Sequence, residues 1–381
     1  MKIASIVGAR PQFVKAAVLS RELRRMPQIK EIVIHTGQHY DSNMSDVFFH
    51  DLQFHADYNL GVGSGLPGAQ TGRMLERIEP VLLDIRPDWV LVYGDTNSTL
   101  AGTLAAVKLH IPVAHVEAGL RCFDLHVPEE LNRVIADHAS DLLFAPSALA
   151  VENLLRENID RSRIFLTGDV MYDAFLQYAG RADHSDVLNE LQIQPRGYIL
   201  ATIHRAENTD VLQRLTAIIE GLIDVAQGIP VVLPMHPRTR RALDQTGLLQ
   251  KTANGVRVID PVGYLEMMVL EQHARLIATD SGGVQKEAFF YGVPCVTLRA
   301  RTEWEELVRS GWSSLAEPKS SSAVANAVRQ ALQSSPPPCE NPYGNGYSSE
   351  RIVGILLAQV SRLNNTTACR ERREFAATGN Q

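Results

Sequence analysis

Short apolar runs alternate with longer amphipathic segments along the chain. Residues 2–7 (KIASIV) predict a buried strand, and a Gly-Ala-Arg-Pro turn leads from it into a helix with apolar residues at helical spacing. Pro11 suits the first turn of that helix, where its missing N–H costs nothing. Buried strands that alternate with helices indicate a parallel sheet covered on both faces. Further strands are predicted at 31–36, 88–94, 112–117 and 142–146, with helices near 69–86, 97–109 and 129–139.

The same alternation starts again near residue 195. The boundary between the two alternating halves falls around 167–190, where TGDVMYDAF leads into a polar stretch. We therefore predict two doubly wound, Rossmann-like α/β domains, at 1–170 and 171–347, and a disordered tail at 364–381. The strands of the second domain are predicted at 197–204, 230–236, 256–260, 275–280 and 294–299.

Composition narrows the class of protein further. The 381 residues suit two domains, and a hydrophobic fraction of 45% supplies two cores. The net charge of −6 argues against a nucleic-acid or anionic-membrane partner, because both favour a basic surface. Without a signal sequence or a run of about 18 apolar residues, we expect a cytoplasmic protein. The four cysteines lack CxxC spacing and are interpreted as reduced thiols: Cys122, Cys295, Cys339 and Cys369.

The polar motifs lie at the carboxyl ends of the predicted strands, where open parallel sheets bind ligands. The first motif is GARPQFVK, in which Gly8 permits a tight turn and the following helix N-terminus can face an anion. Arg10 and Lys15 add positive charge there. The alternative is an ordinary turn with two solvated cations.

Carboxylates form the second motif. Asp95 follows the strand 88–94, Glu117 ends the strand 112–117, and Glu129 opens a helix. Acids that meet at one site raise one another's pKa and can serve as general acid or base. Asp95 and Glu129 could instead cap their helices. Capping explains Glu117 less well, because it directly ends an apolar strand and Ala-Gly follows it.

The third motif, TIHRAENTD, follows the first strand of the second domain. His204 could titrate near neutrality there, and Arg205 could hold a phosphate. His236 in PMHPRTR is open to the same interpretation. For both histidines, a purely structural role is the alternative.

The fourth motif, TDSGGVQKEA, ends a strand and opens a helix. Ser281, Gly282 and Gly283 would present free N–H groups to an anion, and diphosphate is the natural occupant. Glu287, farther along the helix, could then reach ribose hydroxyls. The alternative is a tight junction capped by Asp280. The sequence contains no GxSxG, HExxH or Walker motif, and we predict no metal site.

Together these motifs resemble one family, the non-hydrolysing UDP-N-acetylglucosamine 2-epimerases, over nearly the whole chain to about residue 360. The resemblance implies a glycosyltransferase B type fold with substrate in an interdomain cleft, a C-terminal helix at about 348–363 that packs on the first domain, and a homodimer. The motifs, in order, are GARPQFVK, HTGQHYD, YGDTNSTLAG, HVEAGLR, PEELNR, TIHRAENTD, DPVGYLEM, TDSGGVQKEA and NPYGNGYSSERI.

The family's reaction eliminates UDP to give a 2-acetamidoglucal and adds UDP back with C2 inverted, without an added cofactor. Carried over by motif, Asp95, Glu117, Glu129 and His204 match catalytic positions, and Arg10 and Lys15 match cations of the cleft. The resemblance implies that Glu117 or Glu129 acts at C2 while Asp95 supports proton transfer. His204 would stabilise the leaving diphosphate or act as an acid. Supply of an activated sugar for polysaccharide biosynthesis is the implied use.

Two departures from the family bear on substrate and regulation. Tyr40 follows Gln38–His39 where regulated members carry Arg, which argues against a second, regulatory UDP-sugar site. Several motifs are closer to a subgroup that acts on UDP-2,3-diacetamido-2,3-dideoxyglucuronate, so this sugar is the alternative substrate. The motifs are also compatible with a UDP-sugar glycosyltransferase, a hydrolysing epimerase that releases free N-acetylmannosamine, and a non-catalytic UDP-sugar binding protein.

Overall fold

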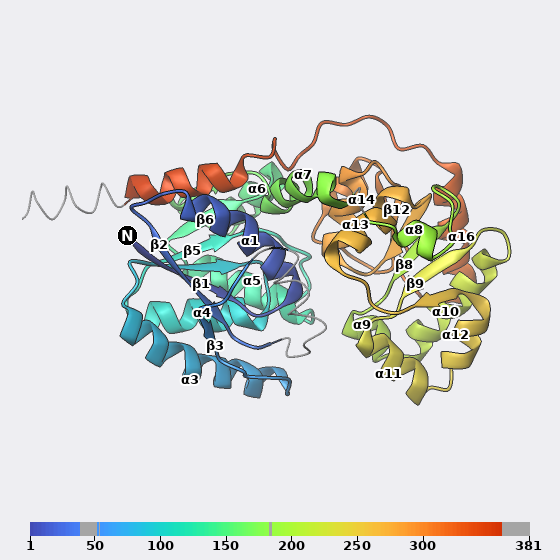
Figure 1. Ribbon diagram of the computed structural model, residues 1–381, viewed down its shortest axis with the longest axis horizontal. Helices are drawn as coiled ribbons and strands as arrows, with labels where there is room; N and C mark the ends of the chain where they lie inside the picture. Colours follow the sequence, from blue (N-terminus) through green and yellow to red (C-terminus); the bar gives the residue numbers. More distant parts are fainter. Residues whose placement is uncertain (39–51, 53, 183–184, 360–381) are drawn as a thin grey trace, which may run out of the picture. The chain divides into compact units, whose positions relative to one another are not determined.

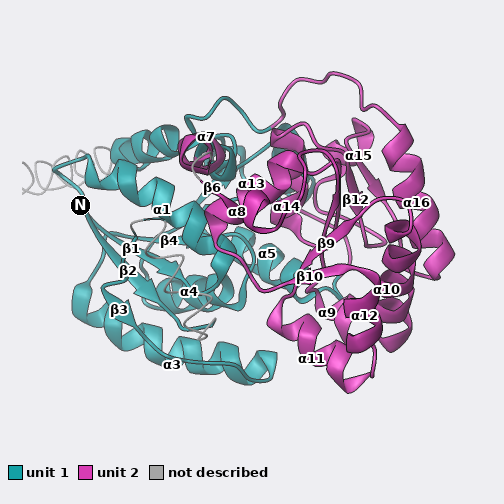
Figure 2. Cartoon of the chain, turned by 45° about the vertical axis from the view of Figure 1, so that its right-hand side comes forward, with its two compact units in different colours: residues 1–119, 125–173, 343–381 teal, residues 120–124, 174–342 magenta. Residues whose placement is uncertain are grey.

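The computed structural model describes residues 1–38, 52, 54–182 and 185–359 (Figure 1). The chain forms two compact units (Figure 2). The first unit comprises 1–119, 125–173 and the residues from 343 onward, and the second comprises 120–124 and 174–342. Tyr40 and the tail predicted at 364–381 lie outside the described residues.

The first unit is built on a seven-stranded parallel sheet with the order β3-β2-β1-β4-β5-β6-β7. Its strands are β1 (Lys2–Val7), β2 (Lys30–His35), β3 (Tyr58–Asn59), β4 (Trp89–Tyr93), β5 (Val113–Val116), β6 (Leu142–Ala145) and β7 (Ile164–Leu166). Its helices are α1 (Arg10–Arg24), α3 (Pro67–Ile85), α4 (Asn97–Lys108), α5 (Pro128–Ala139), α6 (Ala148–Arg156), the single 3₁₀ turn η1 (Arg161–Arg163), and residues 348–359. Helix α7 (Val170–Ala182) continues from this unit into the second.

Both faces of this sheet are covered. Helices α3 and α4 pack on one face, where Met74 and Ile78 meet strand residues such as Ile6 and Val92. Helix α1 lies on the opposite face (Figure 1). The central strands are therefore apolar at consecutive positions, as expected for a sheet without a solvent-facing side.

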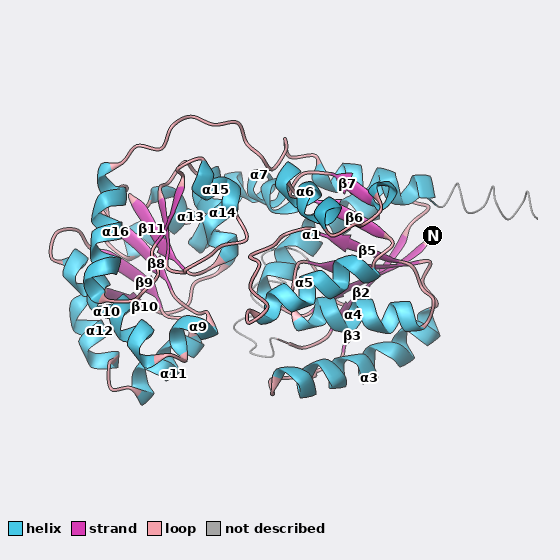
Figure 3. Ribbon diagram, turned by 180° about the vertical axis from the view of Figure 1, so that it is seen from behind, coloured by secondary structure: helices cyan, strands magenta, loops and turns pink. Residues whose placement is uncertain are grey.

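The second unit repeats this design with a six-stranded parallel sheet of order β10-β9-β8-β11-β12-β13. Helices α10 and α16 pack on one of its faces, and α13 and α14 lie on the other (Figure 3). Its strands are β8 (Ile199–Thr202), β9 (Val231–Pro234), β10 (Arg257–Ile259), β11 (Leu276–Thr279), β12 (Cys295–Thr297) and β13 (Ser313–Leu315). Its helices are α8 (Val187–Glu190), α9 (Ala206–Thr209), α10 (Leu212–Ala226), α11 (Pro237–Gln245), α12 (Leu249–Gly255), α13 (Tyr264–His273), α14 (Gly282–Phe290), α15 (Glu305–Arg309) and α16 (Ser321–Gln333).

Every strand predicted from the sequence is present, and the prediction of two doubly wound α/β units is confirmed. The prediction missed β3, β7 and β13, which are edge strands of two or three residues with partly exposed side chains. β3 and β13 carry no run of buried apolar residues that a pattern could reveal, whereas the short apolar run of β7 was not predicted. None of the described helices is long and apolar enough to span a membrane.

The strand orders determine where a ligand can bind. In each sheet one pair of neighbouring strands is not consecutive in the sequence. The pair is β1 and β4 in the first unit, and β8 and β11 in the second. Helices leave opposite faces of the sheet at such a switch point, which opens a crevice outside the carboxyl ends of the strands. Gly8–Arg10, Asp95, His204–Arg205 and Ser281–Gly283 follow these four strands, whereas Glu117 follows β5 and His236 follows β9.

Candidate active site

The turn after β1 is shaped by a close approach of backbone to side chains. A Cβ on Gly8 would lie 2.0 Å from Ser98 Oγ and 2.1 Å from Thr36 Oγ1, so only glycine fits. Gln12 Oε1 accepts the N–H groups of Gly8 and Ala9 at 2.8 and 3.1 Å. Those two amides are therefore occupied within the protein.

Gln12 was not singled out by the sequence analysis. Its Nε2 donates to the Tyr93 carbonyl oxygen at 2.8 Å and to Thr99 Oγ1 at 3.0 Å. One amide side chain thus joins the turn after β1 to the turn after β4. The signal in the sequence is a Gln at the third position of the helix, where it can bond the N-terminal amides.

Lys15 and Glu117 form an ion pair in which Lys15 Nζ donates to Glu117 Oε2. Their side chains are only 9% and 5% exposed, so each charge needs the other to offset its lost hydration. Glu117 has a φ of +72°, an unusual conformation for a residue with a side chain. A Cβ on Gly94 would lie 3.0 Å from both charged atoms, so the Gly94–Asp95 turn runs directly beside the pair.

Asp95 does not cap α4, so the capping interpretation is wrong for this residue. The N-cap is Thr96, whose side chain accepts the N–H of Thr99. The Asp95 carboxylate lies 3.7 Å from Arg133 Nη1, and its carbonyl oxygen accepts Asn132 Nδ2–H at 2.9 Å. Asp95 is therefore held against α5 with its carboxylate partly exposed.

Glu129 lies half-buried in the first turn of α5. The next residue, Glu130, is buried and lies 3.3 Å from Arg133 Nε. An acid in the first turn is favoured by the helix dipole, so that explanation of Glu129 stays open beside the catalytic one. The structure thus brings Lys15, Glu117 and Asp95 to the ends of β4 and β5.

In the second unit, a buried carboxylate organises the turn that carries His204 and Arg205. Asp280, fully buried at the end of β11, accepts the backbone N–H groups of both residues at 3.0 Å and Asn208 Nδ2–H at 3.1 Å. Burial raises the pKa of the Asp280 carboxyl above its ordinary value, while these hydrogen bonds oppose the rise. The alternative in which Asp280 caps the junction is wrong, because Asp280 bonds this turn and α14 takes Ser281 as its N-cap.

The His204 ring lies between two partners. Its Nδ1 is 3.5 Å from Asp280 Oδ1, and its ring centroid is 5.3 Å from that of His236. His236 is the N-cap of α11, where its Nδ1 accepts the N–H of Arg238 at 3.1 Å. His236 therefore has a structural role and also lies beside the His204 ring.

The N-terminus of α14 has the features of an anion site. Ser281 is its N-cap but makes no side-chain bond to the helix. Within the part of the chain that the structure describes, the amides of Gly282 and Gly283 have no protein acceptor. A Cβ on Gly282 would lie 2.5 Å from Glu303 Oε1, whereas one on Gly283 would have only Ser281 Oγ nearby, at 4.0 Å. Glu287, 6% exposed, accepts a hydrogen bond from Tyr264 Oη at 3.1 Å.

A buried ion network supports this helix terminus, and the sequence analysis missed it. Arg299, 2% exposed, donates from Nε to Glu207 and from Nη1 to Glu303, both at 2.8 Å. Burial lowers the pKa of Arg299, but Glu303 and Glu207 outweigh it and hold that pKa above its usual value. Arg205 Nη2 lies 3.5 Å from Glu303. Arg299 and Glu303 follow β12 whereas Arg205 and Glu207 follow β8, so the network joins two segments that are far apart in the sequence.

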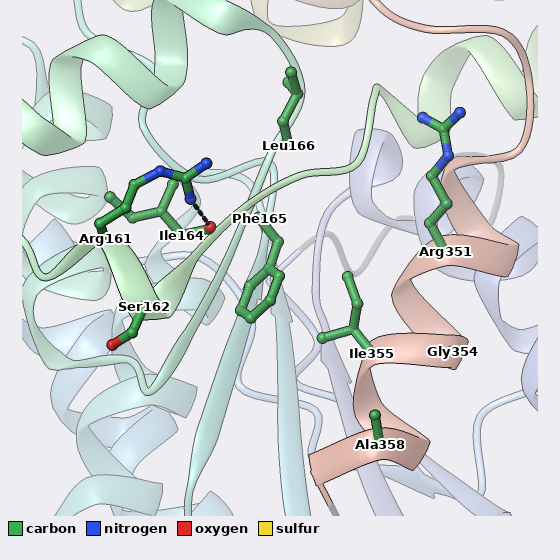
Figure 4. Close-up of a pocket in the computed structure, with 9 residues that line it drawn as sticks. All are labelled: Arg161, Ser162, Ile164, Phe165, Leu166, Arg351, Gly354, Ile355 and Ala358. Carbon is green, nitrogen blue, oxygen red and sulfur yellow. Dashed lines mark hydrogen bonds between the residues drawn. The ribbon is translucent and has the colours of Figure 1, made fainter.

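One cavity among the described residues of the first unit lies away from this site. It measures about 620 Å³ and lies between β7 and the helix 348–359, where Phe165 and Ile355 face each other (Figure 4). Its lining is mainly apolar and contains no predicted site residue. We therefore place the chemistry at the strand ends, where polar groups converge. Among the described residues, no group of three or more His, Cys, Asp and Glu side chains is placed to hold a metal ion.

Comparison with known proteins identifies relatives that match nearly the whole chain. The chain is 50% identical over 360 residues to a UDP-2,3-diacetamido-2,3-dideoxy-D-glucuronate 2-epimerase of Pseudomonas aeruginosa, covering 93% of this chain and 99% of that protein. It is 45% identical over 365 residues to a UDP-N-acetylglucosamine 2-epimerase of Methanocaldococcus jannaschii, with the same coverage.

Solved structures give the same result. The crystal structure of the M. jannaschii UDP-GlcNAc 2-epimerase in complex with UDP-GlcNAc and UDP matches with a TM-score of 0.90, covering 94% of this chain and 100% of that one. This match confirms the predicted fold class. The family model described as UDP-N-acetylglucosamine 2-epimerase matches residues 21–357. The chain therefore belongs to the UDP-N-acetylglucosamine 2-epimerase family of isomerases.

Proposed function

We propose that this chain inverts C2 of a UDP-linked 2-acetamido sugar, converting UDP-N-acetylglucosamine to UDP-N-acetylmannosamine by elimination and re-addition of UDP. The observation that carries the proposal is the buried Lys15–Glu117 pair beside Asp95 at the switch point of the first sheet. Proton transfer at C2 needs a carboxylate whose position and charge are controlled, and an elimination needs a second group to assist it.

The family resemblance supplies the role proposed for each group. Glu117 or Glu129 exchanges the C2 proton, Asp95 supports the transfer, and Arg10 and Lys15 supply positive charge. In the second unit, the Ser281 hydroxyl and the amides of Gly282 and Gly283 hold the diphosphate, and Glu287 holds the ribose. The Ser281 amide is already bonded to Thr279 Oγ1 at 2.9 Å. His204 and Arg205 stabilise the charge that develops on the departing diphosphate, assisted by His236. No redox cofactor takes part in this scheme.

UDP-2,3-diacetamido-2,3-dideoxyglucuronate is the second candidate substrate. The observation behind it is that the P. aeruginosa enzyme named for this sugar is 50% identical to the chain. A UDP-N-acetylglucosamine 2-epimerase homolog of Methanococcus maripaludis is equally similar, at 50% identity over 361 residues, so identity does not rank the two sugars. The reaction would be the same, with an added 3-acetamido group and a 6-carboxylate to accommodate.

We further propose that the protein works in the cytoplasm as a homodimer and supplies polysaccharide biosynthesis. The family resemblance supports the dimer and the use. The cysteine pattern supports a reducing compartment, since none of the described cysteines, Cys122, Cys295 and Cys339, takes part in a disulfide.

Proton NMR in deuterated water tests the reaction. With UDP-N-acetylglucosamine, we expect UDP-N-acetylmannosamine that carries deuterium at C2. Free N-acetylmannosamine with accumulating UDP would instead indicate a hydrolysing enzyme. The same assay with the diacetamido-uronate, compared through kcat/KM, decides between the substrates. Absence of C2 exchange with both sugars would refute the proposal.

A further inference from the structure

Two fully buried side chains lie directly behind the carboxylates of the first unit. His115, in the middle of β5, and Asp137, on α5, are both inaccessible to solvent. His115 Nδ1 lies 2.7 Å from Asp137 Oδ1, and His115 Nε2 lies 2.7 Å from the Gly94 carbonyl oxygen. Asp137 Oδ2 accepts the N–H of Gly119 at 3.0 Å.

The donors and acceptors determine where the protons are. A carbonyl oxygen can only accept, so His115 Nε2 carries a hydrogen and donates it to Gly94. A contact of 2.7 Å between Nδ1 and the carboxyl oxygen then requires one shared proton, on the imidazole or on the carboxyl group. In either form the pair is neutral overall, which allows it to be buried completely.

The pair connects the two turns that carry the proposed acid/base groups. Gly94 immediately precedes Asp95, and Gly119 follows Glu117 by two residues. Gly94 and Gly119 have φ values of +60° and +86°, so both turns need a left-handed conformation. His115 bonds the first turn, Asp137 bonds the second, and the short bond between them joins the turns.

The Glu117 turn needs this support because its backbone is strained. Glu117 adopts a φ of +72°, which persists only where the surroundings over-determine it. The N–H of Glu117 is bonded to the Phe144 carbonyl oxygen at 3.1 Å, and the Gly119 carbonyl oxygen accepts Asn153 Nδ2–H at 3.0 Å. The Ala118 N–H is bonded to the same Phe144 oxygen at 3.1 Å, and Asp137 adds a bond at the Gly119 amide.

We propose that His115 and Asp137 are positioning residues for the epimerisation: they hold the Asp95 and Glu117 turns in the one arrangement that presents both carboxylates to the sugar. The inference rests on the proposed function, because it assumes that these carboxylates act at C2. A shift of about 1 Å in such a group can lower a rate by about 100-fold.

Two substitutions of Asp137 separate positioning from mere stability. In Asp137→Asn the amide can donate to Nδ1 of a neutral His115 and still accept the Gly119 N–H, so these two hydrogen bonds are kept while the shared proton is lost. In Asp137→Ala both bonds are lost. Should the alanine variant not fold, Asp137→Ser takes its place.

The matched control is Asp141→Ala. Asp141 Oδ2 accepts the N–H of Val113 at 2.9 Å, so this carboxylate also bonds the backbone of β5, but at the end of the strand opposite to Glu117. Loss of that bond should lower stability and leave turnover unchanged.

The experiment measures C2 epimerisation by NMR, with kcat expressed per UDP-binding site determined by calorimetry, so that unfolded protein does not count. We expect Asp137→Ala to lower kcat by about 100-fold without changing the Kd for UDP. We expect Asp137→Asn to have the same kcat as the control, Asp141→Ala. Wild-type kcat in Asp137→Ala would overturn the proposal. So would an asparagine variant as inactive as the alanine variant, because the shared proton rather than the geometry would then be required. An inactive wild-type enzyme would instead refute the proposed function.

Discussion

Replacing Gly283 with alanine tests whether a diphosphate binds at the N-terminus of α14. The added methyl group would have only Ser281 Oγ within reach, at 4.0 Å, so no protein atom needs to move. Alanine is also preferred over glycine within a helix by roughly 0.5–1 kcal/mol. The variant should therefore be at least as stable as the wild type. A phosphate bonded to these amides, in contrast, would meet the methyl group beside Ser281.

The size of the effect on binding follows from the bond at stake. A hydrogen bond to a charged group contributes about 1.5–3 kcal/mol, and each 1.4 kcal/mol corresponds to about tenfold in affinity. The Kd for UDP should rise by about 10- to 100-fold in Gly283→Ala. Calorimetric titration with UDP measures this change, and thermal unfolding of the same samples measures stability.

Gly68→Ala is the matched control. Gly68 is the second residue of α3, as Gly283 is of α14, and a Cβ there would have no atom within 4 Å. Both variants should gain similar stability, and only Gly283→Ala should lose affinity for UDP. Equal UDP affinity in the two variants would show that the diphosphate lies elsewhere.

Three further predictions concern other parts of the molecule. Glu117→Gln should lower turnover by about 10²- to 10⁴-fold while UDP binding stays measurable, and retained C2 exchange would remove Glu117 from the mechanism. Tyr264→Phe removes the donor to Glu287 and should raise the Kd for UDP by about tenfold. The control Tyr198→Phe also loses a buried hydrogen bond but should lower stability alone. Equal Kd values for the two variants would argue against the ribose contact. Burial raises the pKa of Glu31, against hydrogen bonds from two serine hydroxyls, so the folded protein holds this proton more tightly than the unfolded chain, whose value is 4.5. The free energy of unfolding of the wild type relative to Glu31→Gln should therefore fall as pH rises from 4.5 through the folded value, and a constant difference in urea unfolding would contradict this.

The sequence by itself determined the elements of the fold and the place of the chemistry. Strands buried on both faces must be apolar at consecutive positions, so β1, β4, β5, β8 and β11 are visible as short apolar runs. The carboxyl ends of parallel strands meet at one edge of a sheet, so a polar motif after such a run is placed at the site before any contact is known.

Only the tertiary structure decided which partner each polar side chain has. Asp95 and Thr96 are adjacent candidates for capping α4, and the backbone conformation selected Thr96. Asp280 stands next to the start of α14 but bonds the turn of His204, because β8 and β11 are neighbours in the sheet. Partners separated by tens of residues are brought together by strand order and helix packing. Local spacing carries no information about either, so buried pairs such as His115 with Asp137 cannot be found from the sequence alone.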